Sequence, residues 1–171
     1  MSKLCIGLFG TCGKSTWRKP FIREYQNRGM VEGINFFNPQ VENWDPSCAE
    51  IETEHLAEDS IILFPVTSET YAFGSLSEVG FSILSAIKLD DRRDIVILID
   101  QHLDPELMKD ESQAKDSLRS RALVKQHLKK LRHNNLYVVN TLEEMFDLSL
   151  ILYQSQELLV NYQKQFNPKN K

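Results

Sequence analysis

Short apolar segments recur along the chain, each followed by a stretch with helical spacing, and they constrain its fold more than any other feature. Four are clear, at Leu4–Phe9, Ile34–Phe37, Ile61–Val66 and Ile95–Ile99, and Leu136–Val139 is a shorter fifth. Most lack the strict alternation of apolar and polar residues that marks a strand with one face in water. Continuous apolar runs are typical of parallel strands covered on both faces. We therefore predict about five strands in one buried parallel sheet.

Helical patterns fill the intervals between these strands. They run from about Thr16 to Asn27, Ser47 to Glu58, Leu76 to Ile87, Ser112 to Arg132 and Thr141 towards Gln165. Strands that alternate with helices indicate an α/β fold with a doubly wound parallel sheet. The length of 171 residues suits a single domain spanning residues 1–171. In this domain, residues of about 141–165 form a C-terminal helical extension and residues 166–171 a polar tail.

Charge and cysteine content narrow the classes of function. The formal net charge is −4, which argues against a nucleic acid polymer as partner, because binding phosphates requires a basic surface. The cysteines Cys5, Cys12 and Cys48 show neither disulfide nor metal-ligand spacing, so we expect a reducing, cytoplasmic location. We expect no membrane partner, since no apolar run approaches the length of a membrane span and no signal peptide is recognisable.

The segment Gly74–Gly80 is the strongest indication of a functional site. It follows the strand Ile61–Val66 and opens the next predicted helix, with Ser75 as N-cap and Glu78 in the first turn. Ligands of open α/β sheets bind outside the carboxyl ends of the strands, where this turn falls. Backbone amides and the helix dipole would keep Glu78 ionised, ready to attack an anomeric carbon or to stabilise an oxocarbenium-like transition state. The alternative is that Glu78 only stabilises the helix, by about 0.3–1 kcal/mol.

The turn after the first strand has the composition of a phosphate-binding loop but not its spacing. A Walker A loop needs a glycine at the position of Leu8, and Gly7 is one residue too early. We therefore reject a nucleoside triphosphatase as the leading interpretation. The amides and hydroxyls around Gly10 and Thr11 could still bind an anion or a sugar hydroxyl. A glycine-rich turn without a ligand is the alternative.

Two further segments carry side chains suited to nucleotide-like ligands. The planar guanidinium of Arg18 could hold a phosphate or a carboxylate, and Trp17 could stack on a flat ring, although a Trp packed in the core is the more common case. The loop after the second strand contains Asn38 and Pro39, and its prolines fix its shape, as suits a binding loop. An ordered connector is the alternative for this loop.

Acidic residues crowd the helix predicted at Ser47–Glu58. Their spacing places Glu50 and Glu54 on one face, and Glu52 and His55 on another. A metal site would need further converging ligands, and we find no second cluster in the sequence, so we expect no metal. A solvated acidic face, with one carboxylate turned into a pocket, is the simpler interpretation.

These motifs, in this order, resemble those of the nucleoside 2-deoxyribosyltransferase-like family, which includes relatives that hydrolyse deoxynucleoside monophosphates. The resemblance covers roughly the first hundred residues. Besides the opening strand and its small-residue turn, it comprises Trp17-Arg18, Phe37-Asn38-Pro39, Glu54-His55-Leu56, Asp59 and Gly74–Gly80. It implies a flavodoxin-like fold, a homo-oligomer, a nucleoside or nucleotide substrate, and Glu78 as the nucleophile. We expect no cofactor.

The reaction implied by the resemblance is cleavage of an N-glycosidic bond. Glu78 would attack C1′ of the sugar, and water or an acceptor base would resolve the deoxyribosyl-enzyme. Typical transferases carry an acidic residue several positions before the nucleophile, whereas here Ala72 stands near that position and Glu69 is the nearest acid upstream. Hydrolysis and transfer therefore both stay open. The residues expected to bind substrate are Gly10, Thr11, Trp17, Arg18, Asn38, Pro39, Glu54, Asp59, Gly74, Ser75 and Ser77.

Two other classes of function fit the same sequence. One is a nucleotide- or nucleotide-sugar-binding sensor without turnover, since one fold supports many functions. The other is an assembly module that uses the apolar residues of Leu148–Phe166. Docking of that helix onto its own sheet explains these residues as well.

Overall fold

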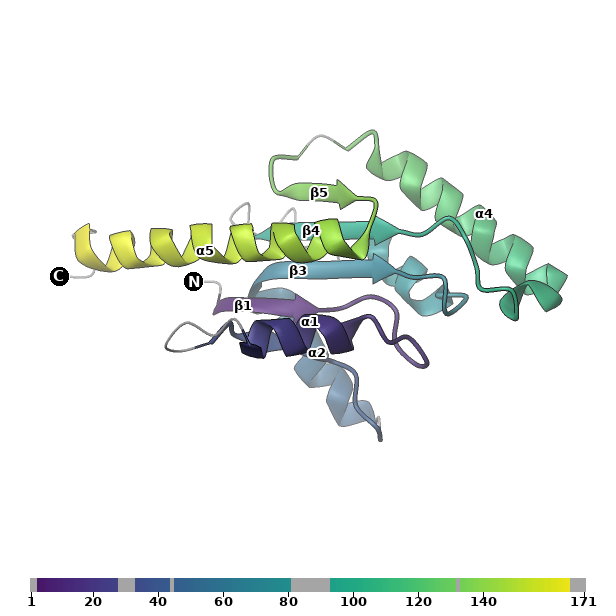
Figure 1. Cartoon of the computed structure of the whole chain (residues 1–171), viewed down its shortest axis with the longest axis horizontal. Coiled ribbons are helices and arrows are strands. Elements are labelled where there is room, and N and C mark those ends of the chain that lie inside the picture. The colour runs from purple at the N-terminus through teal and green to yellow at the C-terminus, as the bar shows by residue number, and fades with distance from the viewer. Residues whose placement is uncertain (1–2, 28–32, 44, 81–92, 132, 167–171) are drawn as a thin grey trace.

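The computed structural model describes residues 3–27, 33–43, 45–80, 93–131 and 133–166 of the chain. Five strands form one parallel sheet in the order β2-β1-β3-β4-β5 (Figure 1). These strands are β1 (Lys3–Leu8), β2 (Phe36–Phe37), β3 (Asp59–Val66), β4 (Asp94–Ile99) and β5 (Leu136–Val139). The prediction of a doubly wound α/β fold is confirmed, and the strand order is flavodoxin-like.

Helices cover both faces of the sheet. The helices on one face are α1 (Arg18–Asn27) and α5 (Leu142–Phe166). The opposite face carries α2 (Pro46–Glu58), the helical residues 73–80 and α4 (Glu111–Leu128), which a short 3-10 turn at Leu107–Lys109 precedes. The chain leaves β1 in one direction to form β2 and then returns past β1 to form β3. This reversal opens a crevice at the carboxyl ends of β1 and β3.

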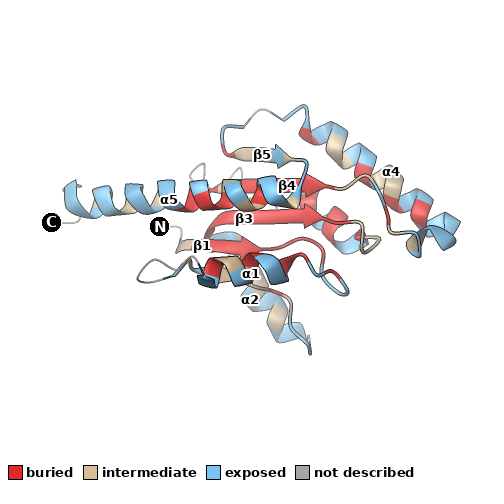
Figure 2. Cartoon of the chain, in the orientation of Figure 1, coloured by how far each residue is buried: buried red, intermediate tan, exposed pale blue. Residues whose placement is uncertain are grey.

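The continuous apolar runs build two cores at once. In β3, Ile61 and Leu63 face α1 and α5, whereas Ile62, Phe64 and Val66 face the opposite layer. Every residue of β3 is buried, and Figure 2 shows the central strands buried along their length. A side-chain period of two explains why runs without alternation fill both layers.

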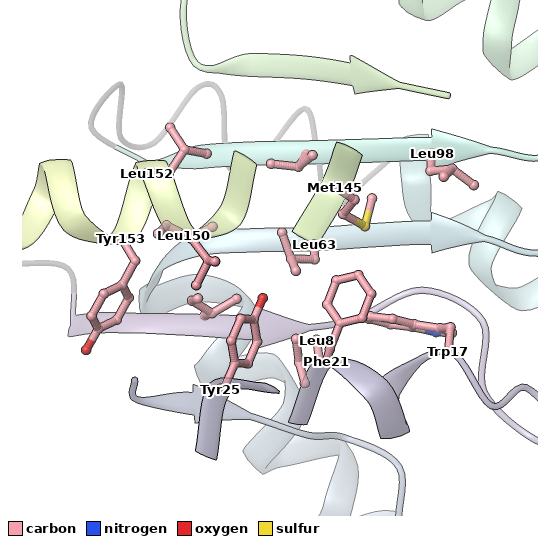
Figure 3. Close-up of a cluster of buried hydrophobic side chains, with 13 residues drawn as sticks. Leu8, Trp17, Phe21, Tyr25, Leu63, Leu98, Met145, Leu150, Leu152 and Tyr153 are labelled. Carbon is pink, nitrogen blue, oxygen red and sulfur yellow. The ribbon is translucent and has the colours of Figure 1, made fainter. Parts of the chain in front are cut away.

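Aromatic residues of α1 join this helix to α5. Trp17, just before α1, meets Phe21 edge to face at 5.2 Å between ring centroids, and Tyr25 lies one turn further along the same face. The hydroxyls of Tyr25 and Ser149 are 2.6 Å apart, which links α1 directly to α5. Figure 3 shows these rings packed with Met145 over the sheet.

Three helices begin earlier than the sequence predicts: α2 at Pro46, the helical residues 73–80, and α4 at Glu111. Asp45, not Ser47, caps α2, because its carboxylate accepts a hydrogen bond from the Ser47 amide at 2.7 Å. The helical residues 73–80 begin after Ala72, whose φ is 56° and whose carbonyl oxygen accepts from the Leu76 amide at 2.8 Å. Ser75 therefore lies inside this helix and is not its cap. The predicted continuation of this helix, to Ile87, lies outside the described residues, as do residues 167–171 of the predicted tail.

The buried cation Arg121 of α4 closes the carboxyl edge of the sheet. Its guanidinium donates to the carbonyl oxygens of Val66, Thr67 and Thr70 after β3 and of Asp100 after β4, at 2.7–3.3 Å. These bonds join α4 to the turns that follow β3 and β4, in addition to the bond that the Asp100 amide donates to the Val66 carbonyl.

Only the first part of α5 docks onto the sheet. Its buried residues end at Tyr153, and beyond this point the helix projects past the strands (Figure 1). The large apolar residues of this stretch are about 60% exposed, and they are Leu158, Leu159, Tyr162 and Phe166. Among the described residues, no helix is long and apolar enough to cross a membrane.

Candidate functional site

A cavity of about 840 Å³ opens at the carboxyl ends of β1 and β2, and we call it the Glu78 cavity. It lies between the turn after β1, the loop after β2, and the helices on either side of the crevice. Its lining residues are Cys12, Gly13, Arg18, Lys19, Ile22, Asn38, Pro39, Gln40, Val41, Glu42, Glu52 and Glu78. Four of the predicted site residues therefore meet in one place, and they are Arg18, Asn38, Pro39 and Glu78.

Glu78 faces this cavity together with a second carboxylate, Glu52 of α2. The pKa of Glu78 is raised because its surroundings partly exclude water and because Glu52 adds negative charge. The expectation that helix amides hold Glu78 ionised is wrong, since the helix begins at residue 73 and Glu78 is its sixth residue. Orphan amides belong to the first turn only. The prediction that one carboxylate of α2 turns into the pocket is confirmed by Glu52.

Arg18 borders the cavity, but its guanidinium is committed to the protein. It donates to the carbonyl oxygens of Leu8, Phe9, Gly10 and Thr11 at 2.5–3.4 Å, and only 2% of the residue is exposed. Burial lowers its pKa. These donors are therefore not free to bind a phosphate, contrary to what the sequence led us to expect. Arg18 instead shapes the turn after β1.

The neighbouring thiol of Cys12 is 3.3 Å from the Arg18 guanidinium. Burial is the largest influence on this thiol and raises its pKa, although the charge of Arg18 opposes the shift. A protonated thiol is a weak nucleophile. The raised pKa therefore disfavours Cys12 as a nucleophile.

Gly10, Thr11 and Trp17 tie this turn to β3 rather than lining the Glu78 cavity. A Cβ at Gly10 would lie 2.3 Å from the Pro65 carbonyl oxygen. The Thr11 hydroxyl lies 3.0 Å from the same oxygen, and the Trp17 indole donates to the Thr11 carbonyl at 3.1 Å. Trp17 is buried in the core, as the common case for Trp predicts.

The carboxylate of Glu69 occupies the polar turn after β1, which the sequence analysis proposed as a possible anion site. Its carboxylate accepts from the hydroxyls of Ser15, Thr16 and Thr67 and from the Thr16 amide. Burial opposes ionisation, but these hydrogen bonds together hold the pKa of Glu69 below its ordinary value. The turn does bind an anion, and the anion is a side chain of the same protein.

A second, smaller cavity of about 360 Å³ lies beside Glu69, at the carboxyl ends of β3, β4 and β5. Thr16, Trp17 and Asp100 line it with Glu69, and Glu78 does not. Glu69 is thus an unsuitable proton donor for chemistry at Glu78, although it is the nearest acid upstream in the sequence.

Hydrogen bonds within the loop after β2 hold its shape. The Asn38 side-chain oxygen accepts from the Gln40 amide at 3.1 Å, and the Gln40 side chain donates to the Gly13 carbonyl at 2.8 Å. This loop is therefore joined across the mouth of the cavity to the turn after β1. Both interpretations of this loop require such order, and its role in binding stays a prediction.

The remaining predicted residues do not line either cavity. Glu54 lies on the exposed face of α2, and Gly74 and Ser77 are exposed on the helix that carries Glu78. Ser75 is buried in that helix. Asp59 is completely buried at the amino end of β3, the end of the strand away from both cavities, so it cannot touch a ligand there.

Sequence reasoning missed Cys12, Lys19, Gln40 and Glu42 as lining residues. No motif distinguishes them, and their neighbours Gly13, Arg18 and Pro39 were the available signal. Comparisons of the chain with family models, curated proteins and solved structures found no match. The chemistry must therefore be argued from the cavity itself, which presents two interacting carboxylates, amide side chains and one lysine.

Proposed function

We propose that this chain cleaves the N-glycosidic bond of a nucleoside, with Glu78 as the nucleophile. The observation that carries the proposal is that Glu78 and Glu52 line one cavity, where partial burial and the charge of Glu52 raise the pKa of Glu78. Most enzymes that cleave a glycosidic bond through an oxocarbenium-like transition state use a pair of catalytic carboxylates. The cavity volume of about 840 Å³ suits a ligand of nucleoside size.

In the proposed reaction, an ionised Glu78 oxygen forms a bond to C1′ while the C1′–N bond breaks. The electron pair of that bond leaves with the base, which takes up a proton. Glu52 lines the same cavity as Glu78, and its carboxyl group is the donor that we propose for this proton. Water or a second base then attacks C1′ and releases Glu78, which gives hydrolysis or transfer respectively.

The charges of the lining favour an uncharged nucleoside over its monophosphate. Glu42, Glu52 and Glu78 oppose one lysine, Lys19, and the donors of Arg18 are spent on backbone carbonyls. A phosphate carries about two negative charges at neutral pH. Repulsion between this phosphate and the acidic lining would weaken binding of a monophosphate, so we propose the nucleoside as the preferred substrate.

The experiment is incubation with a panel of deoxynucleosides and their monophosphates, followed by chromatography for released base. We expect release from at least one nucleoside, and loss of at least about a thousandfold in Glu78→Gln. Quenched wild-type enzyme should carry a deoxyribosyl group on the peptide that contains Glu78, detected by mass spectrometry.

The matched control is Glu54→Gln, which removes the same charge from the exposed face of α2. It should keep full activity. Adding a second base separates transfer from hydrolysis. Binding of a nucleoside without release of base from any member of the panel would refute the enzyme and support a sensor instead.

A further inference from the structure

Away from both cavities, three metal-binding residue types converge near the amino end of the sheet. Cys5 of β1, His55 of α2 and Asp59 of β3 bring a sulfur, a ring nitrogen and a carboxylate oxygen within 4.8 Å of one another. His55 Nδ1 is 3.0 and 3.1 Å from the two oxygens of Asp59. We propose that these three residues bind a zinc-type divalent metal ion.

The donor set and its spacing suit this class of ion. Thiolate, imidazole and carboxylate are the ligands that zinc takes in proteins, at about 2.0–2.3 Å. Donors arranged around such an ion are separated by roughly 3–4 Å in a tetrahedral site. The three donors need only small movements to reach these positions, and the fourth position is left for water or another ligand.

Burial makes a positive ion valuable at this place. Asp59 is completely buried and Cys5 is 1% exposed, so a carboxylate and a thiolate would both be removed from water here. Buried charges of one sign are costly unless a cation compensates them. A hydrogen bond between His55 and Asp59 without an ion is the competing account of the same cluster.

The local backbone holds the three residues in place. The pairing of β1 with β3 steps from Lys3–Asp59 to Ile6–Ile61, so β1 contains one residue more than β3 across this interval. Cys5 lies in the irregularity, and extra residues of this kind often re-aim a side chain near a functional site. Ser60 Oγ lies 3.4 Å from the Cys5 amide nitrogen and so holds this irregular segment against β3.

His55 and Asp59 are anchored independently. The His55 ring stacks on Phe37, with 3.7 Å between centroids and 3° between planes. Arg93 donates to the Asp59 carbonyl at 2.9 Å and to the Leu56 carbonyl, which fixes the corner between α2 and β3. A Cβ at Gly7 would come within 2.9 Å of an Asp59 oxygen, so the glycine keeps space open beside that ligand. Outer contacts that orient ligands in this way are typical of metal sites.

The site would join the end of α2 to the two central strands, because its ligands come from all three elements. An ion that binds the native chain and not the unfolded chain stabilises the fold. The proposal is independent of any activity at Glu78, and its test needs no substrate.

The test uses the full chain, stripped with a chelator and titrated with Co²⁺. We expect one equivalent to produce a thiolate-to-cobalt charge-transfer absorption, and Zn²⁺ to abolish it by replacement. Cys5→Ser should lose the absorption, whereas Cys12→Ser and Cys48→Ser, the matched controls, should keep it. Asp59→Asn should weaken binding at least about tenfold.

A second measurement keeps the proposal open to refutation if Cys5→Ser fails to fold. The thermal midpoint of the wild-type chain should rise with Zn²⁺ and fall again with chelator. An unchanged midpoint together with no cobalt absorption would overturn the metal site and leave a hydrogen bond between His55 and Asp59. Absorption that vanishes in Cys12→Ser would overturn it as well.

Discussion

The chemistry of the Glu78 cavity depends on how two carboxylates share their charge. Glu78 is not held ionised by its helix, and its pKa is raised by burial and by Glu52. A more basic carboxylate is a better nucleophile once ionised, but it ionises only at higher pH. The fall of kcat/KM at low pH therefore depends directly on the interaction between Glu78 and Glu52.

Replacing Glu52 by Gln should move this fall of kcat/KM to lower pH. Attack on carbon requires ionised Glu78, so kcat/KM falls as the pH drops through the pKa of Glu78. Glu52→Gln removes one of the two causes that raise this pKa, and kcat/KM should then persist to lower pH whatever the effect on the maximal rate. Glu54→Gln should leave the pH dependence of kcat/KM unchanged. An equal shift in both variants would contradict an effect of Glu52 on the pKa of Glu78.

Arg18 shows how a residue can border a site and still serve the backbone. Its planar fork reaches four carbonyls of one turn, and a lysine offers one nitrogen in place of this geometry. We expect Arg18→Lys to lower the free energy of unfolding by about 3 kcal/mol, because buried acceptors lose their donors.

Denaturant unfolding measures this loss. Arg23→Lys is the matched control, since the Arg23 side chain lies on the same helix and is 70% exposed. It should unfold at nearly the wild-type midpoint. Equal stability of Arg18→Lys and wild type would show that the turn does not depend on the guanidinium.

At the scale of elements, patterning predicted which segments form and local chemistry decided where they begin. Strand positions followed from apolar runs, because burial on both faces requires them. The start of the helix before Glu78 could not be predicted, because Ala72 adopts a left-handed φ of 56° that side chains rarely take. That displacement by three residues changed the electrostatic role assigned to Glu78.

The two parts of α5 should differ in their effect on stability. Removing residues after 158 takes away mostly exposed side chains, so the free energy of unfolding should change by less than about 0.5 kcal/mol. Removing residues after 148 deletes the buried Leu150, Leu152 and Tyr153 and should unfold the chain. Circular dichroism during heating measures both.

The same shortened chain also tests assembly. If Leu159, Tyr162 and Phe166 join copies of the protein, sedimentation should report a smaller species for the chain that ends at residue 158. If the full chain and the shortened chain have the same oligomeric state at all concentrations, this part of α5 has no role in assembly.

Across the whole molecule, the fold was more predictable than the site. The α/β class follows from strands that alternate with helices, and right-handed crossovers then set the face of the sheet on which each helix lies. The site depends on which side chains already have partners. Arg18 and Glu69 carry the right chemistry for a ligand, and only tertiary contacts reveal that each already binds groups of the protein. The convergence of Cys5 with His55 and Asp59 likewise needs β1, α2 and β3 placed together.

Arg121 has a consequence for the order of events during synthesis. The carbonyls that it binds lie at Val66, Thr67, Thr70 and Asp100, all made well before the arginine itself. A nascent chain that has not yet released residue 121 from the ribosome holds the central strands but lacks the cation that closes their turns. The segment leading from Thr70 towards Glu78 is therefore completed late, when α4 emerges and packs. Folding from the N-terminus thus leaves the proposed catalytic carboxylate without its final setting until more than two thirds of the protein exists.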